Sequence, residues 1–175
     1  MKMLATMFAS ALLLALVPAG SNLNLGSTLI ATGGGAGSYS TIRAFDRMVG
    51  PDTVLTNENK IAAQYGQTNV NQFIRMFDYA ISDAWKVAGE DNVSMPPPGQ
   101  LSGQALATAL VQAGMQQGGT FDIDHLFSQL FGAKVASQVM TDLNVRFGAG
   151  SSGNFARMAD QFFTNIGQTV GVNVE

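Results

Sequence analysis

The sequence predicts an all-α fold: a five- to six-helix bundle or a globin-like orthogonal packing, preceded by a cleavable signal peptide and a Gly/Ser-rich arm. Apolar residues recur at spacings of three and four along most of the chain. No segment keeps the apolar–polar alternation that marks a half-buried strand. The chain has 175 residues, of which 46% are hydrophobic, so it is long and apolar enough to bury the core of one domain.

The first 19 residues have the composition of a secretory leader. Lys2 supplies positive charge, residues 4–17 are apolar, and Ala19 ends a short segment of small residues. This pattern is typical of a signal peptide cleaved after Ala19, and the apolar run is shorter than the roughly 20 residues that a spanning helix needs. We therefore expect a secreted or periplasmic protein, with no stable membrane insertion after the leader is cleaved.

Residues 20–40 are rich in glycine, serine and asparagine, which is typical of a flexible arm. Its leucines would let a short part of the arm dock on the domain. The run from Gly33 to Gly37 invites comparison with phosphate-binding loops. Ser38, however, stands where G-x-G-x-x-G needs its last glycine. We interpret the segment as a linker.

A single helical domain is expected over residues 41–175. Ser40 or Thr41 would cap its first helix, because hydroxyl side chains accept hydrogen bonds from the first turn. Gly50 and Pro51 would end that helix through turn chemistry. A short helix would follow over residues 57–65.

The pattern over residues 69–91 predicts a helix of about twenty residues, long enough to span a small domain. Asp83 and Lys86 lie three residues apart on its polar face and are placed to pair. Three prolines at 96–98 then predict an extended crossover. The inward positions of the helix are Val70, Phe73, Ile74, Phe77, Ile81, Ala84 and Ala88.

The second half predicts further helices over residues 102–113, 120–147 and 154–169, with Gly132 placed to bend or break the middle one. We find no internal repeat of fixed period. Phe163 and Trp85 fall at the edges of apolar faces, which makes them candidates for exposure at a partner surface.

Composition excludes several classes of function. The chain has no cysteine, so disulfides, thiolate catalysis, cysteine-ligated zinc and iron–sulfur clusters are ruled out. A net charge of -3 with scattered basic residues gives no electrostatic footprint for nucleic acid. The chain has one histidine, so a two-histidine metal motif cannot form and no metal site is expected.

The single histidine, His125, is the one candidate for a chemical role. Asp122 precedes it by three residues on a helix and would either orient the ring or cap the helix beside a partly exposed histidine. His125 would be the ligand if the protein carries haem or another small apolar ligand, with Met115 or Met140 as a second haem ligand. A hydrolase using His125 or a carboxylate pair is a third possibility, although no G-x-S-x-G motif is present.

We therefore expect an exported soluble helical protein that acts by binding or assembly, without a cofactor or a catalytic constellation. Only 12% of its residues are charged, and weakly charged surfaces resist association less than strongly charged ones. The partner would be an unknown protein or a small apolar ligand.

Overall fold

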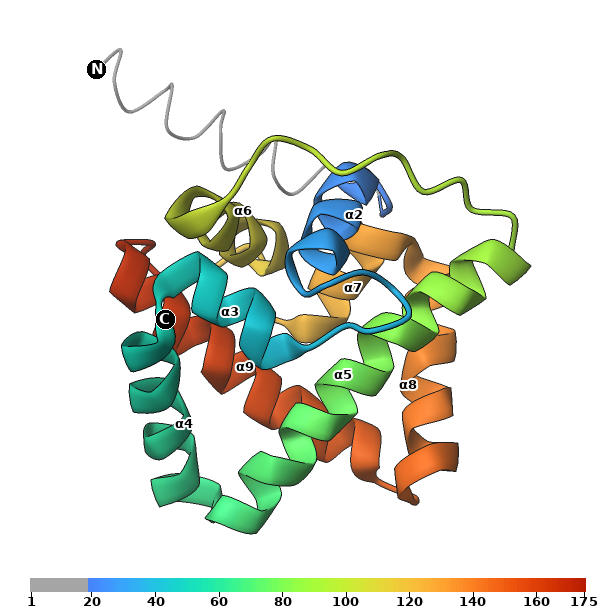
Figure 1. Ribbon diagram of the computed structural model, residues 1–175. Helices are drawn as coiled ribbons and strands as arrows, with labels where there is room; N and C mark the ends of the chain where they lie inside the picture. The colour runs from blue at the N-terminus through green and yellow to red at the C-terminus, as the bar shows by residue number, and fades with distance from the viewer. Residues whose placement is uncertain (1–18) are drawn as a thin grey trace.

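The computed structural model describes residues 19–175 and is all-helical over that range (Figure 1). The leader predicted over residues 1–19 lies outside the described residues except for Ala19. The number of helices was predicted too low, because residues 20–40 contain a helix and Gly132 divides another. In chain order the helices are α2 (Leu23–Thr32), α3 (Thr41–Val49), α4 (Pro51–Tyr65), α5 (Gln67–Glu90), α6 (Gly103–Gly114), α7 (Ile123–Phe131), α8 (Ala133–Phe147) and α9 (Ser151–Val170).

The segment expected to be a flexible arm contains helix α2, and the expected docking of its leucines on the domain is confirmed. Leu25, Leu29 and Ile30 are buried, and α2 packs against α7. At Gly26 the two helices approach so closely that an added Cβ would lie 2.6 Å from the carbonyl oxygen of Leu130. Gly26 therefore serves close packing rather than flexibility.

One predicted boundary also differs from the structure, because the helix expected over residues 57–65 begins at Pro51. Gly50 and Pro51 were expected to end a helix, and they do end α3, but Pro51 is also the first residue of α4. Proline suits the first helical position because the amide it lacks would have no partner there. The proline-rich segment after α5 is extended, as predicted, and crosses from α5 to α6 (Figure 1).

Phenylalanine rings fill the centre of the fold. Most of the positions predicted to face inward are buried. Phe163, predicted to lie at an exposed edge, is instead fully buried and stacks on Phe121 with ring centroids 4.6 Å apart. Trp85 remains partly exposed, as expected. The fully buried phenylalanines are Phe45, Phe73, Phe77, Phe127, Phe131, Phe155, Phe162 and Phe163.

Helices α2–α5 and α6–α9 are two copies of one four-helix arrangement. In each copy a helix of 9 residues is followed by a helix of 15 residues, and a single glycine joins them. Those glycines have nearly the same backbone angles: φ 89° and ψ 149° at Gly50, φ 96° and ψ 151° at Gly132. Gly66 and Gly148 repeat this geometry where the 15-residue helices end. Such angles are almost restricted to glycine, so the residue type is dictated at these junctions.

Equivalent positions are offset by 82 residues, so that 41 matches 123 and 78 matches 160. The backbone amide of Thr41 donates to the carboxylate of Asp78 at 2.7 Å, and the amide of Ile123 donates to Asp160 at 2.8 Å. The prediction of no fixed-period repeat was therefore wrong. The clearest trace in the sequence is Phe73-x-Arg75-Met76-x-Asp78, which recurs as Phe155-x-Arg157-Met158-x-Asp160.

The two copies exchange partners across an approximate two-fold axis. Helix α5 packs on α8 of the other copy and α9 packs on α4, while α3 packs on α6 and α7 packs on α2. Helices α5 and α9 cross at the centre, with α4 and α8 on opposite sides (Figure 1). The contact between α5 and α8 therefore has an equivalent contact between α4 and α9.

Candidate functional site

His125 lies in the first turn of α7 and is half-buried. The carboxylate of Asp122 does not contact its ring. One oxygen of Asp122 caps α7 by accepting from the amide of Asp124 at 3.0 Å, and the other accepts from the side chain of Gln116 at 3.0 Å. Of the two roles considered for Asp122, the structure shows helix capping.

The methionines considered as second haem ligands are both half-buried. Met115 follows α6 and forms an isolated bridge with Phe121. Met140 lines a shallow hollow between α7 and α8. The four main hollows formed by the described residues are lined by residues other than His125.

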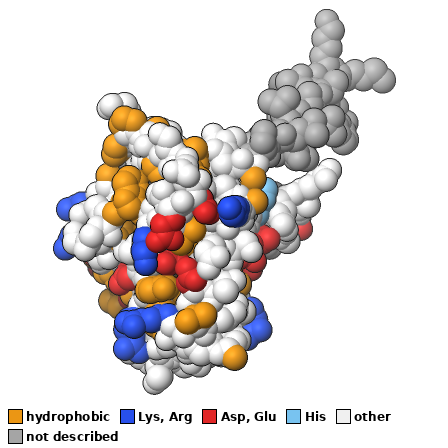
Figure 2. Space-filling view, turned by 90° about the vertical axis from the view of Figure 1, so that its right-hand side faces the viewer, with side chains coloured by type: hydrophobic (Ala, Val, Ile, Leu, Met, Phe, Trp, Pro, Cys, Tyr) orange, Lys and Arg blue, Asp and Glu red, His pale blue; other side chains and the backbone are white. Residues whose placement is uncertain are grey.

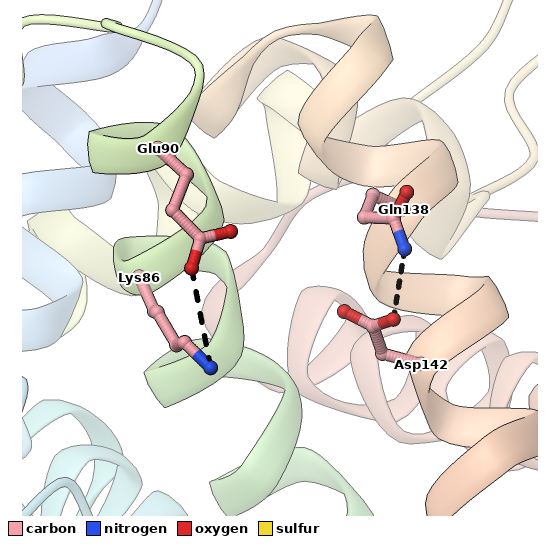
Figure 3. A network of polar contacts seen from close by, with 4 residues as sticks. All are labelled: Lys86, Glu90, Gln138 and Asp142. Carbon is pink, nitrogen blue, oxygen red and sulfur yellow. Dashed lines mark hydrogen bonds and ion pairs between the residues drawn. The ribbon is translucent and has the colours of Figure 1, made fainter.

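A polar hollow of about 300 Å³ lies between the C-terminal half of α5 and α8, at a place the sequence did not predict. Figure 2 shows acidic side chains gathered near the centre of this face, with basic side chains beside them. Figure 3 shows Lys86 and Glu90 on α5 opposite Gln138 and Asp142 on α8. The lining residues are Asp83, Lys86, Val87, Glu90, Asp91, Lys134, Gln138 and Asp142.

Two ion pairs form the rim of this hollow. Lys86 lies 4.0 Å from Glu90, and Lys134 lies 3.6 Å from Asp91. The expected pairing of Asp83 with Lys86 is therefore replaced by a pair within one turn of α5. Both lysines are largely exposed, so the pairs add little to stability. The two pairs nevertheless leave both lysine side chains already paired at the rim of the hollow.

Asp83 forms the floor of the hollow. Its side chain is 8% exposed, and its Oδ2 atom is buried without a hydrogen-bond partner. The neighbouring carboxylate of Asp142 accepts a hydrogen bond from Gln138 at 2.8 Å (Figure 3). Burial, reinforced by Asp142 and only partly opposed by Lys86, raises the pKa of Asp83 to about 7. Near neutral pH Asp83 is therefore partly protonated.

The equivalent hollow between α4 and α9 has a different floor. Asn165 stands at the position equivalent to Asp83, and Lys60 at the position equivalent to Asp142. The amide of Asn165 donates to Asn57 at 2.6 Å, and Asn57 donates to the carbonyl of Phe162 at 3.0 Å. An amide at this position is thus fully compatible with the fold, so packing alone does not require a carboxyl group at Asp83.

The sequence carried one overlooked signal for this site. Asp83 lies between the inward positions Ala80, Ile81 and Ala84 and one turn before Val87, so it interrupts an apolar face. An acid at such a position is costly unless it has a partner or a function. Asp142 could not be linked to it without the fold, because α8 approaches α5 only through tertiary packing.

No helix in residues 19–175 combines the length and apolar character needed to cross a membrane. Within the same range, no three or more carboxylate, imidazole or thiol side chains are placed to hold a metal ion. Comparison with known proteins finds no matching family model, no similar curated protein and no similar solved structure.

Proposed function

We propose that this protein is an exported helical domain that acts by binding, and that the α5/α8 hollow is its binding site. Export is inferred from the leader, with cleavage after Ala19. Binding without a cofactor was the function favoured by the low charge and the missing catalytic motif. The observation that carries the choice of site is the buried, unpartnered Oδ2 atom of Asp83 in a polar hollow.

The free energy of folding supports this choice of site. A buried polar atom without a hydrogen-bond partner lowers stability by about 1–3 kcal/mol, and by more if it is charged. The equivalent position of the other copy avoids this cost with Asn165, whose amide is hydrogen-bonded. A carboxyl group with a raised pKa in an open hollow is typical of a functional site. Asp83 is therefore better explained by a ligand that completes its hydrogen bonds than by a structural role.

Binding is favoured over glycoside hydrolysis at this pair. Hydrolases of that kind keep their two carboxyl groups about 5 Å or more apart, so that the sugar carbon or a water fits between them. Asp142 is a direct neighbour of Asp83 and helps to raise its pKa, so the pair is too close for that arrangement.

The first test is a thermal-unfolding screen of the chain beginning at Gly20. The ligand panel contains organic cations, anions, neutral sugars and apolar compounds. We expect one class to raise the melting temperature of the parent and of Asp52→Asn, but not of Asp83→Asn. Asp52 lines the α4/α9 hollow at the position equivalent to Lys134, so it receives the same chemical change in the other copy without altering the α5/α8 hollow. A class that stabilises all three proteins equally would place the binding site elsewhere.

Absorbance and activity distinguish the alternatives based on His125. A Soret band, or hydrolysis of a test substrate, that disappears in His125→Ala would replace the proposal with a haem carrier or a hydrolase. Export is tested by N-terminal sequencing of protein recovered outside the cytoplasm. The exported chain should begin at Gly20, and one beginning at Met1 would contradict cleavage.

A further inference from the structure

We propose that the α5/α8 hollow binds an alkylammonium group, which is seated between Asp83 and Asp142. This inference rests on the proposed function and specifies its ligand. The ammonium group would come either from a free diamine or from a lysine side chain of a peptide.

Charge favours a cation at this site. The hollow is lined by four carboxyl groups and two lysines. Both lysines are engaged at the rim, by Glu90 and Asp91. Among the described residues no cation therefore pairs with Asp83 and Asp142 at the floor. When Asp83 is ionised this leaves two negative charges there, and a bound monocation would neutralise one of them.

Geometry favours an ammonium group over a metal ion. Calcium takes six to eight oxygen ligands, and magnesium requires near-octahedral coordination. The described residues offer no group of three or more ligating side chains at this place. An ammonium group needs fewer acceptors, because its three N–H donors can be shared between two carboxyl groups and water.

Geometry also favours ammonium over guanidinium. Guanidinium presents a planar fork that matches the two oxygens of one carboxylate. Here one carboxyl group comes from each of two helices, and an oxygen of Asp142 already accepts from Gln138. Two carboxyl groups that converge from opposite walls suit a compact charge with tetrahedral donors. The carbon chain would lie along Val87, which also lines the hollow.

Binding should depend on pH, because the ammonium group competes with the proton held by Asp83. Burial raises the pKa of Asp83 to about 7, so Asp83 keeps its proton below neutral pH and loses it above. Alkylammonium groups stay charged over this range, since their pKa is about 10.4. Affinity should therefore be about tenfold higher at pH 8 than at pH 6. The groups that face Asp83 are Tyr79, Lys86 and Glu90 from α5 and Asp142 from α8, with Asp91 and Lys134 at the rim and Arg146 beyond Tyr79.

The test is titration calorimetry of the chain beginning at Gly20, with 1,5-diaminopentane in one arm and an acetyl-lysine-amide peptide in the other. Each arm is run at pH 6 and pH 8 in two buffers of different ionisation enthalpy. We expect release of about one proton per ligand at pH 6 and almost none well above pH 8, as linkage requires. The arm that binds more tightly identifies the source of the ammonium group.

Variants and competing ligands make the result specific. Asp83→Asn should weaken binding at pH 8 at least tenfold, and Asp52→Asn should leave it unchanged. Tetramethylammonium, which has no N–H donor, and calcium should bind at least tenfold more weakly. If Asp83→Asn does not fold, Asp142→Asn and the proton release of the parent chain decide the question.

Three outcomes would overturn the inference. They are ammonium binding without proton release at pH 6, equal binding by tetramethylammonium, and binding that Asp83→Asn leaves unchanged. If ammonium ligands fail while another class in the panel still requires Asp83, the inference falls and the binding function stands. If no ligand class depends on Asp83, both fall.

Discussion

Phe73 and Phe155 occupy equivalent positions of the two copies, and their rings pack against each other with centroids 5.7 Å apart. Equivalent residues that contact each other must lie close to the axis that relates the copies. Both side chains are fully buried. This contact joins α5 to α9 at the centre of the fold.

Because Phe73 and Phe155 are equivalent, removing either ring should lower the stability of the fold by a similar amount. Phe73→Ala and Phe155→Ala should each lower the free energy of unfolding by about 3–5 kcal/mol, the usual cost of removing a buried aromatic ring. Leu55→Ala, at a side chain that is 56% exposed, should change it by less than about 0.5 kcal/mol. Urea unfolding followed by circular dichroism measures all three. A large cost at one phenylalanine only would contradict the symmetric arrangement.

Asp78 and Asp160 each hold the start of a helix by a hydrogen bond. Substitutions at these two equivalent positions should therefore have matching effects on stability. Each accepts from the first amide of a helix in the same copy, that of Thr41 or Ile123. Alanine at either position should cost about 1–2 kcal/mol, as for a lost helix cap. Asparagine keeps an acceptor and should cost less. Equal losses for alanine and asparagine would show that charge, rather than hydrogen bonding, holds these helices.

Asp83 predicts the pH dependence of stability. Its pKa is raised from 3.8 to about 7 in the folded chain, so the folded state holds a proton that the unfolded state has already released. This contribution is fully present below about pH 4 and is lost as pH rises through 7. Asp83→Asn should therefore gain stability relative to the parent as pH rises from 4 to 8. Urea unfolding across this range is the measurement, and a difference that does not vary with pH would refute the raised pKa of Asp83.

A second carboxyl group should add to the same trend. Burial, opposed by the amide of Ile123 and reinforced by Asp122 and Asp124, raises the pKa of Asp160 to about 6. Its contribution is lost at lower pH than that of Asp83, as pH rises through 6. Parent and Asp160→Asn should therefore diverge mainly between pH 4 and 6, while Asp83→Asn continues to diverge up to pH 7.

Two glycines predict opposite effects of the same substitution. A Cβ at Gly114 would overlap the buried ring of Phe121, whereas a Cβ at Gly153 meets nothing within 4 Å. Gly114→Ala should destabilise the chain by about 1–3 kcal/mol through overpacking. Gly153→Ala should stabilise α9 by about 0.5–1 kcal/mol, because alanine loses less entropy in a helix. A thermal melt of each variant gives the sign directly.

The sequence predicted the helices wherever apolar spacing was regular. The inward face of α5 and the break at Gly132 both follow from local pattern and backbone chemistry. Helix α2 was missed because the glycines in and around it suggested flexibility, and the contact of Gly26 with α7 forms only through tertiary packing. The repeat was missed because helix lengths and a few contacts carry it, such as the amide bonds to Asp78 and Asp160.

The candidate site was harder to predict than the fold. His125 attracted attention because it is the single histidine, yet it lines none of the four hollows described above for residues 19–175. Asp83 looked like an ordinary polar-face residue until the fold placed α8 over it. The closeness of Asp142 to Asp83 and the contrast with Asn165 both depend on tertiary packing. Neither can be predicted from the spacing of residues within one helix.

The single-glycine junctions limit how this chain can change in length. One extra residue beside Gly50, Gly66 or Gly132 would turn the following helix by about 100°, since an α-helix has 3.6 residues per turn. Its apolar face would then leave the core. Insertions should be tolerated instead in the exposed crossover around residues 96–102, which joins the two copies. That crossover is therefore the natural place for a new terminus, a tag or a protease site.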